Sequence, residues 1–248
     1  MIYLVFLIGL IIGSFLNVCI YRVPRGESIV FSRSRCPHCG HKLKWWELMP
    51  VISFLILRGK CSECDNPISW YYTFVELFTA IIMVILFLNF NLNASFYVYS
   101  FLFSILMVLS GIDIKFGIIP DIISIPSIVI GFILSIFITP VGLVNSLLGI
   151  ATGGGILLLI SYLSNGGMGG GDIKMMAMVG AFTGWKVAVF SIFLGAFIGA
   201  VNGIILILIH DDKDMKTPLP FGPYLSFATL ISILYYQDII DFYIDFLF

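Results

Sequence analysis

Eight apolar segments, each long enough or nearly long enough to cross a lipid bilayer, dominate this sequence. A helix that spans a bilayer needs about 20 apolar residues, and fewer where it is kinked or packed inside a bundle. The segments predicted to span are 2–20, 71–89, 95–112, 122–139, 142–163, 173–184, 187–209 and 222–237. Because 60% of the residues are hydrophobic and only 11% are charged, against about a quarter charged in soluble domains, we predict an all-α polytopic membrane protein with about eight transmembrane helices.

The basic residues predict which way these helices run. No Lys or Arg precedes Arg22, which is the reverse of the charge order in a cleaved signal peptide, so we expect a retained first helix with its N-terminus outside. Eight spans then place four loops in the cytosol, namely 21–70, 113–121, 164–172 and 210–221. Of the 13 Lys and Arg residues, all except Lys186 lie in these loops or within a turn of them, as the positive-inside rule requires. We therefore expect a multi-pass protein in contact with membrane lipid, with no nucleic-acid partner.

The single long polar stretch divides the predicted chain into three parts. These are a first transmembrane helix at 1–20, a cytosolic domain at 21–70 and a membrane domain at 71–248. The cytosolic domain contains two C-x-x-C pairs, formed by Cys36, Cys39, Cys61 and Cys64. Two such pairs can supply four thiolates to one tetrahedral ion, and the reducing cytosol disfavours disulfides. We predict a structural four-cysteine zinc site that folds this small segment, with thiol redox chemistry or free cysteines as the alternatives.

Two aspartates are predicted to reach the same cytosolic face of the membrane. Asp113 ends the third predicted span, and Asp172 follows Gly169–Gly171 and begins the sixth. Carboxylates beside a bilayer are costly and are therefore candidates for function, although either aspartate alone fits a helix cap or a solvated charge equally well. Two carboxylates that share one proton are suited to acid–base hydrolysis, because one can take a proton from water while the other polarises a carbonyl group. The three glycines are expected to let backbones approach closely around this pair and to adopt dihedral angles closed to other residues.

Several motifs, in the same order, resemble one protease family. Asp113 is followed by Pro120 seven residues later, and Gly169–Gly171 stand directly before Asp172. This pattern is similar to the aspartyl intramembrane proteases with a G-x-G-D motif, and specifically to the type IV prepilin peptidases. The resemblance covers nearly the whole chain, and three further stretches carry it: GSFLNVCIYRVP (Gly13–Pro24), WWELMPVISFLILRGKC (Trp45–Cys61) and GMGGGDIKMM (Gly167–Met176). By this resemblance Asp113 and Asp172 form the catalytic pair, and Asp121 has at most a supporting role.

The resemblance implies an enzyme of the bacterial inner membrane with two activities. The first is that of an aspartic-type endopeptidase, which removes the short basic leader from type IV prepilins or pseudopilins at the cytosolic face, in pilus assembly and protein secretion. Relatives with an amino-terminal zinc domain also methylate the new N-terminus with S-adenosylmethionine. The sequence contains no glycine-rich nucleotide-binding loop of the familiar kind, so the residues that bind the methyl donor stay unassigned, with Glu47, Glu76 and Arg22 as candidate contacts.

Two other functions are consistent with parts of the sequence. A transporter of protons or cations can also use membrane carboxylates and glycine-interrupted helices, although we find no internal repeat and both aspartates lie near one face rather than at the midplane. A zinc-binding module that recruits partners leaves the paired aspartates unexplained. The acidic loop at 210–216, with Asp211, Asp212 and Asp214, is a candidate contact for the basic leader, although charged loops are commonly only solvated.

Overall fold

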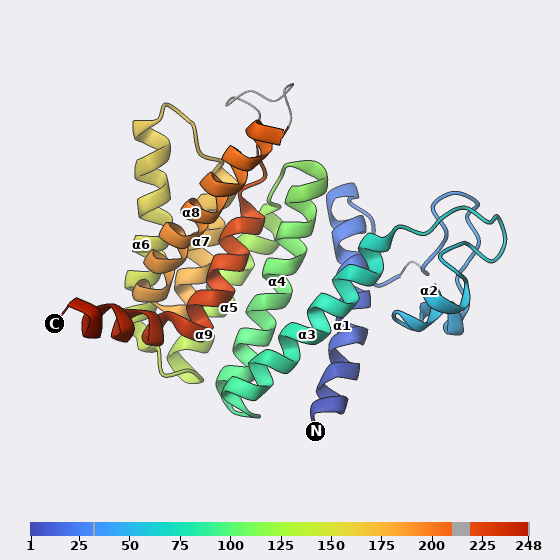
Figure 1. Cartoon of the computed structure of the whole chain (residues 1–248), viewed down its shortest axis with the longest axis horizontal. Coiled ribbons are helices and arrows are strands. Elements are labelled where there is room, and N and C mark those ends of the chain that lie inside the picture. Colours follow the sequence, from blue (N-terminus) through green and yellow to red (C-terminus); the bar gives the residue numbers. More distant parts are fainter. Residues whose placement is uncertain (32, 210–218, 248) are drawn as a thin grey trace. The chain divides into compact units, whose positions relative to one another are not determined.

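The computed structural model describes residues 1–31, 33–209 and 219–247, and helices account for most of them (Figure 1). The α-helices are α1 (Ile2–Arg22), α2 (Ile52–Ile56), α3 (Trp70–Phe90), α4 (Ala94–Phe116), α5 (Asp121–Phe137), α6 (Gly142–Leu163), α7 (Gly170–Thr183), α8 (Trp185–Ile209) and α9 (Gly222–Leu247). Two 3-10 helices, η1 (Val23–Arg25) and η2 (Trp45–Leu48), lie between α1 and α2. Within the described ranges the only β pairing is two isolated bridges, so the predicted all-α class is confirmed.

Each of the eight predicted spans coincides with one of the longer helices, from α1 and α3 through to α9. In the part of the chain that the structure describes, five helices are long and apolar enough to cross a membrane, namely α1, α3, α4, α6 and α8. The chain is therefore a multi-pass membrane protein, while the count of eight spans stays a prediction. The helix α7 has only 14 residues, which extend about 21 Å against a hydrocarbon core of about 30 Å.

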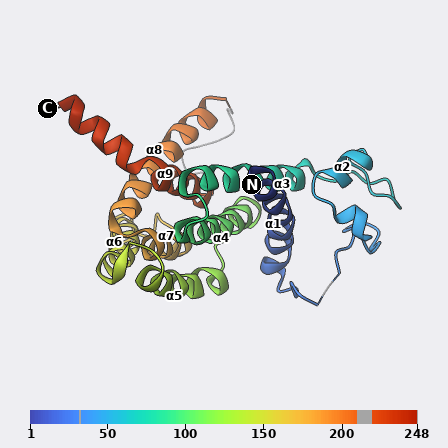
Figure 2. The ribbon, with the colours of Figure 1, turned by 90° about the horizontal axis from the view of Figure 1, so that it is seen from below.

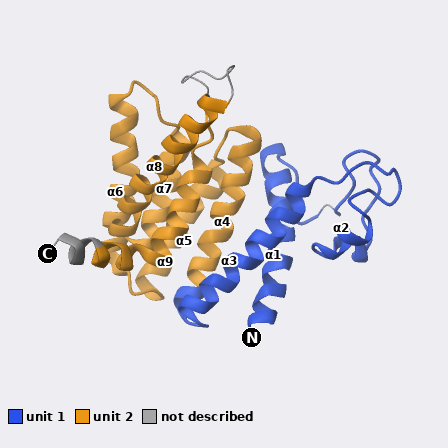
Figure 3. Cartoon of the chain, viewed as in Figure 1, with its two compact units in different colours: residues 1–96 blue, residues 97–248 orange. Residues whose placement is uncertain are grey.

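The helices form two compact units, residues 1–96 and residues 97–248 (Figure 3). In the first unit α1 and α3 pack against each other along Gly9 and Gly13 of α1. A Cβ atom at Gly9 would lie 2.6 Å from the Cα atom of Ala80, and one at Gly13 would lie 2.7 Å from the Cα atom of Glu76. Small residues spaced four apart let two membrane helices approach to backbone contact. This contact fixes α1 beside the first half of α3, and the polar segment of the first unit connects these two helices.

In the second unit α7 is the central helix, and it contacts α5, α6, α8 and α9 (Figures 1 and 2). Its completely buried side chains include Met175, Met176, Met178, Val179 and Phe182. The closest approach is to α6, where a Cβ atom at Gly149 would lie 2.1 Å from the carbonyl oxygen of Gly180. Because α7 is enclosed by protein, its apolar sequence reflects a place in the core and does not require the full length of a bilayer span.

Candidate active site and metal centre

Four cysteine sulfurs in the first unit lie together in an arrangement that can hold a metal ion. The Sγ atom of Cys36 is 3.9 Å from that of Cys64, and the Sγ atom of Cys39 is 3.9 Å from that of Cys61. All four sulfurs lie within 4.8 Å of one another. A tetrahedral ion with metal–sulfur bonds of about 2.3 Å separates its ligands by about 3.8 Å, so the cluster fits a closed four-thiolate site. The structure thus brings together the four residues that the sequence predicts as metal ligands.

The two C-x-x-C turns have matching backbone structures. In the first turn the N–H of Gly40 donates to the carbonyl oxygen of Cys36, and in the second the N–H of Asp65 donates to that of Cys61. Gly40 and Asp65 occupy the same position in their turns and have positive φ angles of 74° and 54°. Glycine adopts this left-handed conformation freely, and aspartate tolerates it better than most residues. Each turn therefore presents two sulfurs from a tight backbone loop.

Glu47 is buried beside the cysteine turns and connects three parts of the first unit. Its carboxylate accepts a 2.6 Å hydrogen bond from the N–H of Lys44 and another hydrogen bond from the hydroxyl of Ser62, and it lies 3.1 Å from Nε2 of His41. Burial raises the pKa of Glu47, but these hydrogen bonds outweigh it and hold the pKa below its usual range. Both carboxylate oxygens of Glu47 accept hydrogen bonds, so Glu47 links η2 to the two cysteine turns and stabilises their arrangement.

The other two candidate contacts for a methyl donor differ in how they are used. Arg22 is buried at the end of α1 and donates to the backbone carbonyl groups of the following loop, at 3.1 Å to Ser28 and 3.1 Å to Arg33. Glu76 is buried in α3 and accepts a 2.8 Å hydrogen bond from the N–H of Val51. Arg22 therefore shapes the loop after η1, and both Arg22 and Glu76 line a cavity of the first unit.

Asp113 lies in the last turn of α4 and is only 7% exposed. Its Oδ2 atom accepts a 2.9 Å hydrogen bond from the N–H of Gly222, the first residue of α9. A helix N-terminus favours a negative charge, so α9 helps to hold this carboxylate in place. A Cβ atom at Gly222 would lie 2.9 Å from the same oxygen, which explains the glycine. Hydropathy does not reveal this partner, because 109 residues separate the two positions in the chain.

Asp172 lies in the first turn of α7 and is 9% exposed. The helix begins after Gly169 and has no side-chain cap hydrogen bond, so Asp172 does not serve as a cap. Its Oδ1 atom is buried and has no hydrogen-bond partner among the described residues. Buried polar atoms in native proteins are nearly always paired, so this oxygen needs a hydrogen-bond donor that the described residues do not supply.

The two buried aspartates belong to the same unit, Asp113 on α4 and Asp172 on α7. Asp121, the first residue of α5, is instead exposed. The Nζ atom of Lys174 lies 2.6 Å and 2.7 Å from its two carboxylate oxygens. The structure therefore buries Asp113 and Asp172 in the same unit and leaves Asp121 in a surface ion pair between α5 and α7. The acidic loop at 210–216 lies outside the described residues.

The glycines before Asp172 are explained by space rather than by unusual dihedral angles. A Cβ atom at Gly169 would lie 3.0 Å from Oδ2 of Asp172, and one at Gly171 would lie 2.7 Å from Cβ of Ile119. Gly170, between them, has nothing within 4 Å of its Cβ position. Gly169 has a φ angle of −67°, and the next two are helical. The expectation that they adopt dihedral angles closed to other residues is therefore wrong, whereas close packing is confirmed at the two outer glycines.

Both units match families of known proteins. Residues 7–90 match the Bacterial Peptidase A24 N-terminal domain, and residues 100–204 match the Type IV leader peptidase family. The prepilin leader peptidase/N-methyltransferase of Bacillus subtilis is 35% identical over 98% of this chain and 98% of its own length. Those of Pseudomonas aeruginosa and Xanthomonas campestris are 32% and 34% identical, over 97% and 96% of this chain and 92% and 93% of their own lengths. No solved structure matches the chain. The chain therefore belongs to the type IV leader peptidase family, as its motifs predict.

Proposed function

We propose that this protein removes the leader peptide from type IV prepilins or pseudopilins, with Asp113 and Asp172 as the catalytic pair. The observation that carries the proposal is the burial of two carboxylates in one unit, each near an end of an apolar helix. One is held by the N-terminus of α9, and the other has an oxygen without a partner among the described residues. The relatives named prepilin leader peptidase/N-methyltransferase support the same assignment.

Two carboxyl groups that share one proton can hydrolyse a peptide bond directly. The ionised carboxylate takes a proton from a water molecule, whose oxygen attacks the carbonyl carbon of the bond after the leader. The protonated carboxyl group donates to the carbonyl oxygen, where negative charge develops. The tetrahedral intermediate then collapses, the carbon–nitrogen bond breaks, and the leaving amine takes up a proton. The products are the free leader and a pilin with a new α-amino group.

The cleavage is proposed to take place at the cytosolic face, with the N-terminus of the enzyme outside. The distribution of Lys and Arg along the chain supports this orientation. A basic leader stays in the cytosol for the same electrostatic reason, while the apolar pilin helix lies in the bilayer, so the bond between them arrives at that face. In this proposal the chain consists of a first helix (1–20), a cytosolic zinc-binding domain (21–70) and a membrane peptidase domain (71–248).

The second proposed activity is methylation of the freed α-amino group, for which S-adenosylmethionine supplies an electrophilic methyl group. The four cysteines of the first unit are proposed to hold zinc in a closed structural site. Among the described residues of 21–70, the buried hydrophobic side chains are Cys36, Phe54 and Cys61. A segment with so small a core needs the folding free energy that a structural metal supplies.

The experiment that tests the peptidase proposal uses the full-length protein in detergent with a prepilin peptide. Asp113→Asn and Asp172→Asn are each expected to lower kcat/KM for cleavage by about 10³-fold or more, because each removes a carboxyl group that transfers a proton. Both variants should still methylate a pilin peptide that has already been cut, which shows that they are folded. Full cleavage by either variant would overturn the assignment.

Asp121→Asn is the matched control for these two substitutions. Its ion pair with Lys174 is exposed, and exposed pairs contribute about 0–1 kcal/mol, so cleavage should stay within about threefold of the wild type. A loss as large as that of the buried pair would give Asp121 a catalytic role. Proton-coupled cation uptake in liposomes, without cleavage of any prepilin, would favour the transporter alternative instead.

A further inference from the structure

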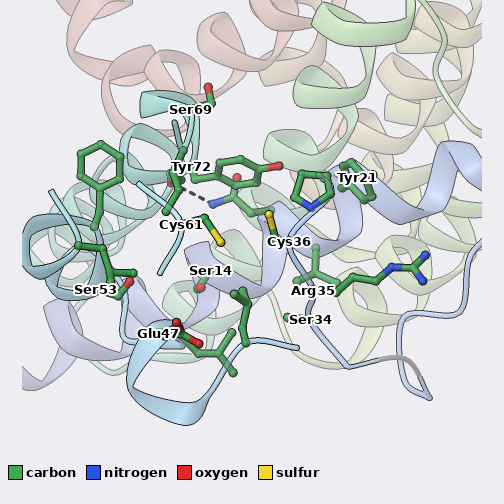
Figure 4. Close-up of a pocket in the computed structure, with 18 of the residues that line it drawn as sticks. Ser14, Tyr21, Ser34, Arg35, Cys36, Glu47, Ser53, Cys61, Ser69 and Tyr72 are labelled. Carbon is green, nitrogen blue, oxygen red and sulfur yellow. Dashed lines mark hydrogen bonds between the residues drawn. The ribbon is translucent and has the colours of Figure 1, made fainter. Parts of the chain in front are cut away.

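The first unit contains a cavity of about 420 Å³ that the proposed peptidase does not use (Figure 4). Its walls come from the second half of α1, the first turns of α3, the helix α2 and both cysteine turns. Figure 4 shows Ser14 and Tyr21 of α1, Tyr72 of α3, and Cys36 and Cys61 around this space. Cavities that bind small molecules have volumes of about 300–1,000 Å³. The cavity therefore has the size of a cofactor site, and it is formed entirely by the first unit.

One residue that lines the cavity has a buried acceptor atom with no hydrogen-bond partner in the described part of the chain. Asn17 is 5% exposed, and its Nδ2 atom donates a 2.9 Å hydrogen bond to the carbonyl oxygen of Tyr72. Its Oδ1 atom is buried and has no partner among the described residues. A buried acceptor of this kind is stabilised when a bound molecule donates a hydrogen bond to it. Asn17 therefore indicates a ligand with N–H or O–H groups.

A buried carboxylate adds negative charge to the same cavity. Glu76 is 8% exposed and accepts a hydrogen bond from the N–H of Val51. Val51 has a φ angle of 61°, a strained conformation for a β-branched residue. Strain of this kind persists where the surrounding structure fixes a functional group, and here it directs a backbone N–H at the carboxylate. The carboxylate favours positive charge in the part of the ligand next to it, while Arg22 and Arg35, which also line the cavity, favour an anionic group such as a carboxylate elsewhere in the ligand.

The remaining walls combine aromatic and apolar surface. Tyr72, Phe54, Leu57 and Ile68 line the cavity between the polar groups. Flat apolar surface of this kind accommodates a purine ring, and an aromatic face also attracts a cation. An adenosyl sulfonium compound combines all of these properties, since it has a purine ring, hydroxyl and ammonium donors, and a positive sulfur.

We propose that this cavity binds the S-adenosylmethionine used in the methyl transfer proposed above, on which this inference rests. Asn17 accepts a hydrogen bond from the donor, Glu76 stabilises its positive charge, and the aromatic and apolar wall holds its adenine ring. In the transfer, the amine nitrogen of the pilin forms a bond to the methyl carbon. The carbon–sulfur bond breaks, sulfur keeps the electron pair, and the methylated ammonium group releases a proton to water. Because Cys36 and Cys61 line the cavity, the metal site also shapes the donor site.

The test measures binding of S-adenosylhomocysteine, the demethylated product, to the full-length protein in detergent by calorimetry. Asn17→Leu removes the acceptor, and Ser53→Phe fills the cavity from α2. Each is expected to weaken binding about tenfold or more and to lower methyl transfer, while zinc content and leader cleavage stay within about twofold of the wild type. Asn89→Leu is the matched control, because Asn89 is exposed on α3 and donates to the carbonyl oxygen of Ile85 in its own helix.

Two outcomes would overturn the assignment in different ways. Unchanged affinity in both cavity variants, with normal binding by the wild type, would place the donor elsewhere and leave the proposed methyltransferase activity standing. A wild-type protein that neither binds S-adenosylhomocysteine nor transfers a methyl group would remove the activity together with the site. A second experiment labels the wild type with a photoreactive 8-azidoadenosyl analogue of the donor, so its result does not depend on whether the variants fold. Label in peptides from α1, α2 or α3 supports the cavity, and label confined to residues 97–248 rejects it.

Discussion

Gly171 has no room for a Cβ atom beside Ile119, and a Cβ atom at Gly169 would press on the carboxylate of Asp172. The residue between them, Gly170, meets no such neighbour, which matches the variable position of a G-x-G-D motif. Gly171 lies against Ile119, which belongs to the short connection between α4 and α5. The contact therefore sets how closely the first turn of α7, with Asp172, approaches the segment that follows Asp113. The packing of Gly171 against Ile119 therefore helps to determine where Asp172 lies in the candidate site.

Gly171→Ala is expected to lower leader cleavage about tenfold or more. The new Cβ atom would lie 2.7 Å from Cβ of Ile119, a branched atom next to the backbone, so α7 must shift and carry Asp172 with it. Misplacement of a catalytic group by about 1 Å can cost about 10²-fold in rate. Gly170→Ala places the same methyl group in open space and should cleave at close to the wild-type rate. Equal rates for the two variants, measured as kcat/KM on one prepilin peptide, would show that this contact does not position the aspartate.

At the scale of secondary-structure elements, the pairing of α6 with α7 depends on a row of glycines in α6. A Cβ atom at Gly149 would lie 2.1 Å from the carbonyl oxygen of Gly180, and one at Gly153 would lie 2.3 Å from that of Met176. Gly155, in the same helix, has no atom within 4 Å of its Cβ position. The two helices therefore meet backbone to backbone along one face of α6, which allows α7 to sit in the centre of the second unit.

Gly149→Ala is expected to destabilise the protein by about 1–3 kcal/mol, because overpacking a tight contact forces the backbones apart. Gly155→Ala is its control, and it should leave stability unchanged or raise it by about 0.5–1 kcal/mol, since alanine has the higher helix propensity. The measurement is the thermal midpoint of each variant in the same detergent. A Gly149→Ala variant as stable as Gly155→Ala would mean that the helices do not need this contact.

Hydropathy predicts the helices of this chain well because each of them had to bury or expose apolar surface over several turns. The predicted segment 142–163 coincides with α6 (Gly142–Leu163), and the other seven begin within two residues of their helices, except for 173–184, which begins three residues late. The predicted end of a helix is less accurate where the helix continues into polar residues. The prediction for α9 ended at 237, but the helix continues to Leu247, since polar residues after Tyr236 end an apolar run without breaking a backbone hydrogen-bond ladder.

The site could be predicted in part for the same physical reason. Asp113, Asp172 and the four cysteines carry charges or thiols in patterns that are visible along the chain. The partners of these groups are not visible, because contacts such as that between Asp113 and Gly222 join positions 109 residues apart. The side-chain oxygen of Asn17, which has no partner among the residues that the structure describes, likewise follows from burial against α3, and one asparagine in an apolar helix does not by itself reveal it.

At the scale of the whole molecule, the two proposed activities belong to different compact units. The cysteine cluster and the cavity lie within residues 1–96, and the aspartate pair lies within residues 97–248. Each unit contains the whole of one of the two matched ranges, 7–90 and 100–204. Domains with separate cores can lose function independently. Damage confined to the metal site should therefore separate the two activities.

Replacing Cys36 and Cys39 together by serine is expected to abolish the proposed zinc binding, because two ligands cannot complete a tetrahedral site. The polar segment of the first unit then loses the folding free energy that the metal supplies, and with it the shape of the cavity lined by Cys36 and Cys61. Methyl transfer should fall about tenfold or more, while leader cleavage stays within about threefold of the wild type.

Zinc is measured by mass spectrometry of the metal, and Cys19→Ser is the control, because Cys19 is buried in α1 and does not belong to the cluster. Wild-type methyl transfer by a zinc-free variant would refute the structural role of the metal, and an equal loss of cleavage would show that the two units depend on each other.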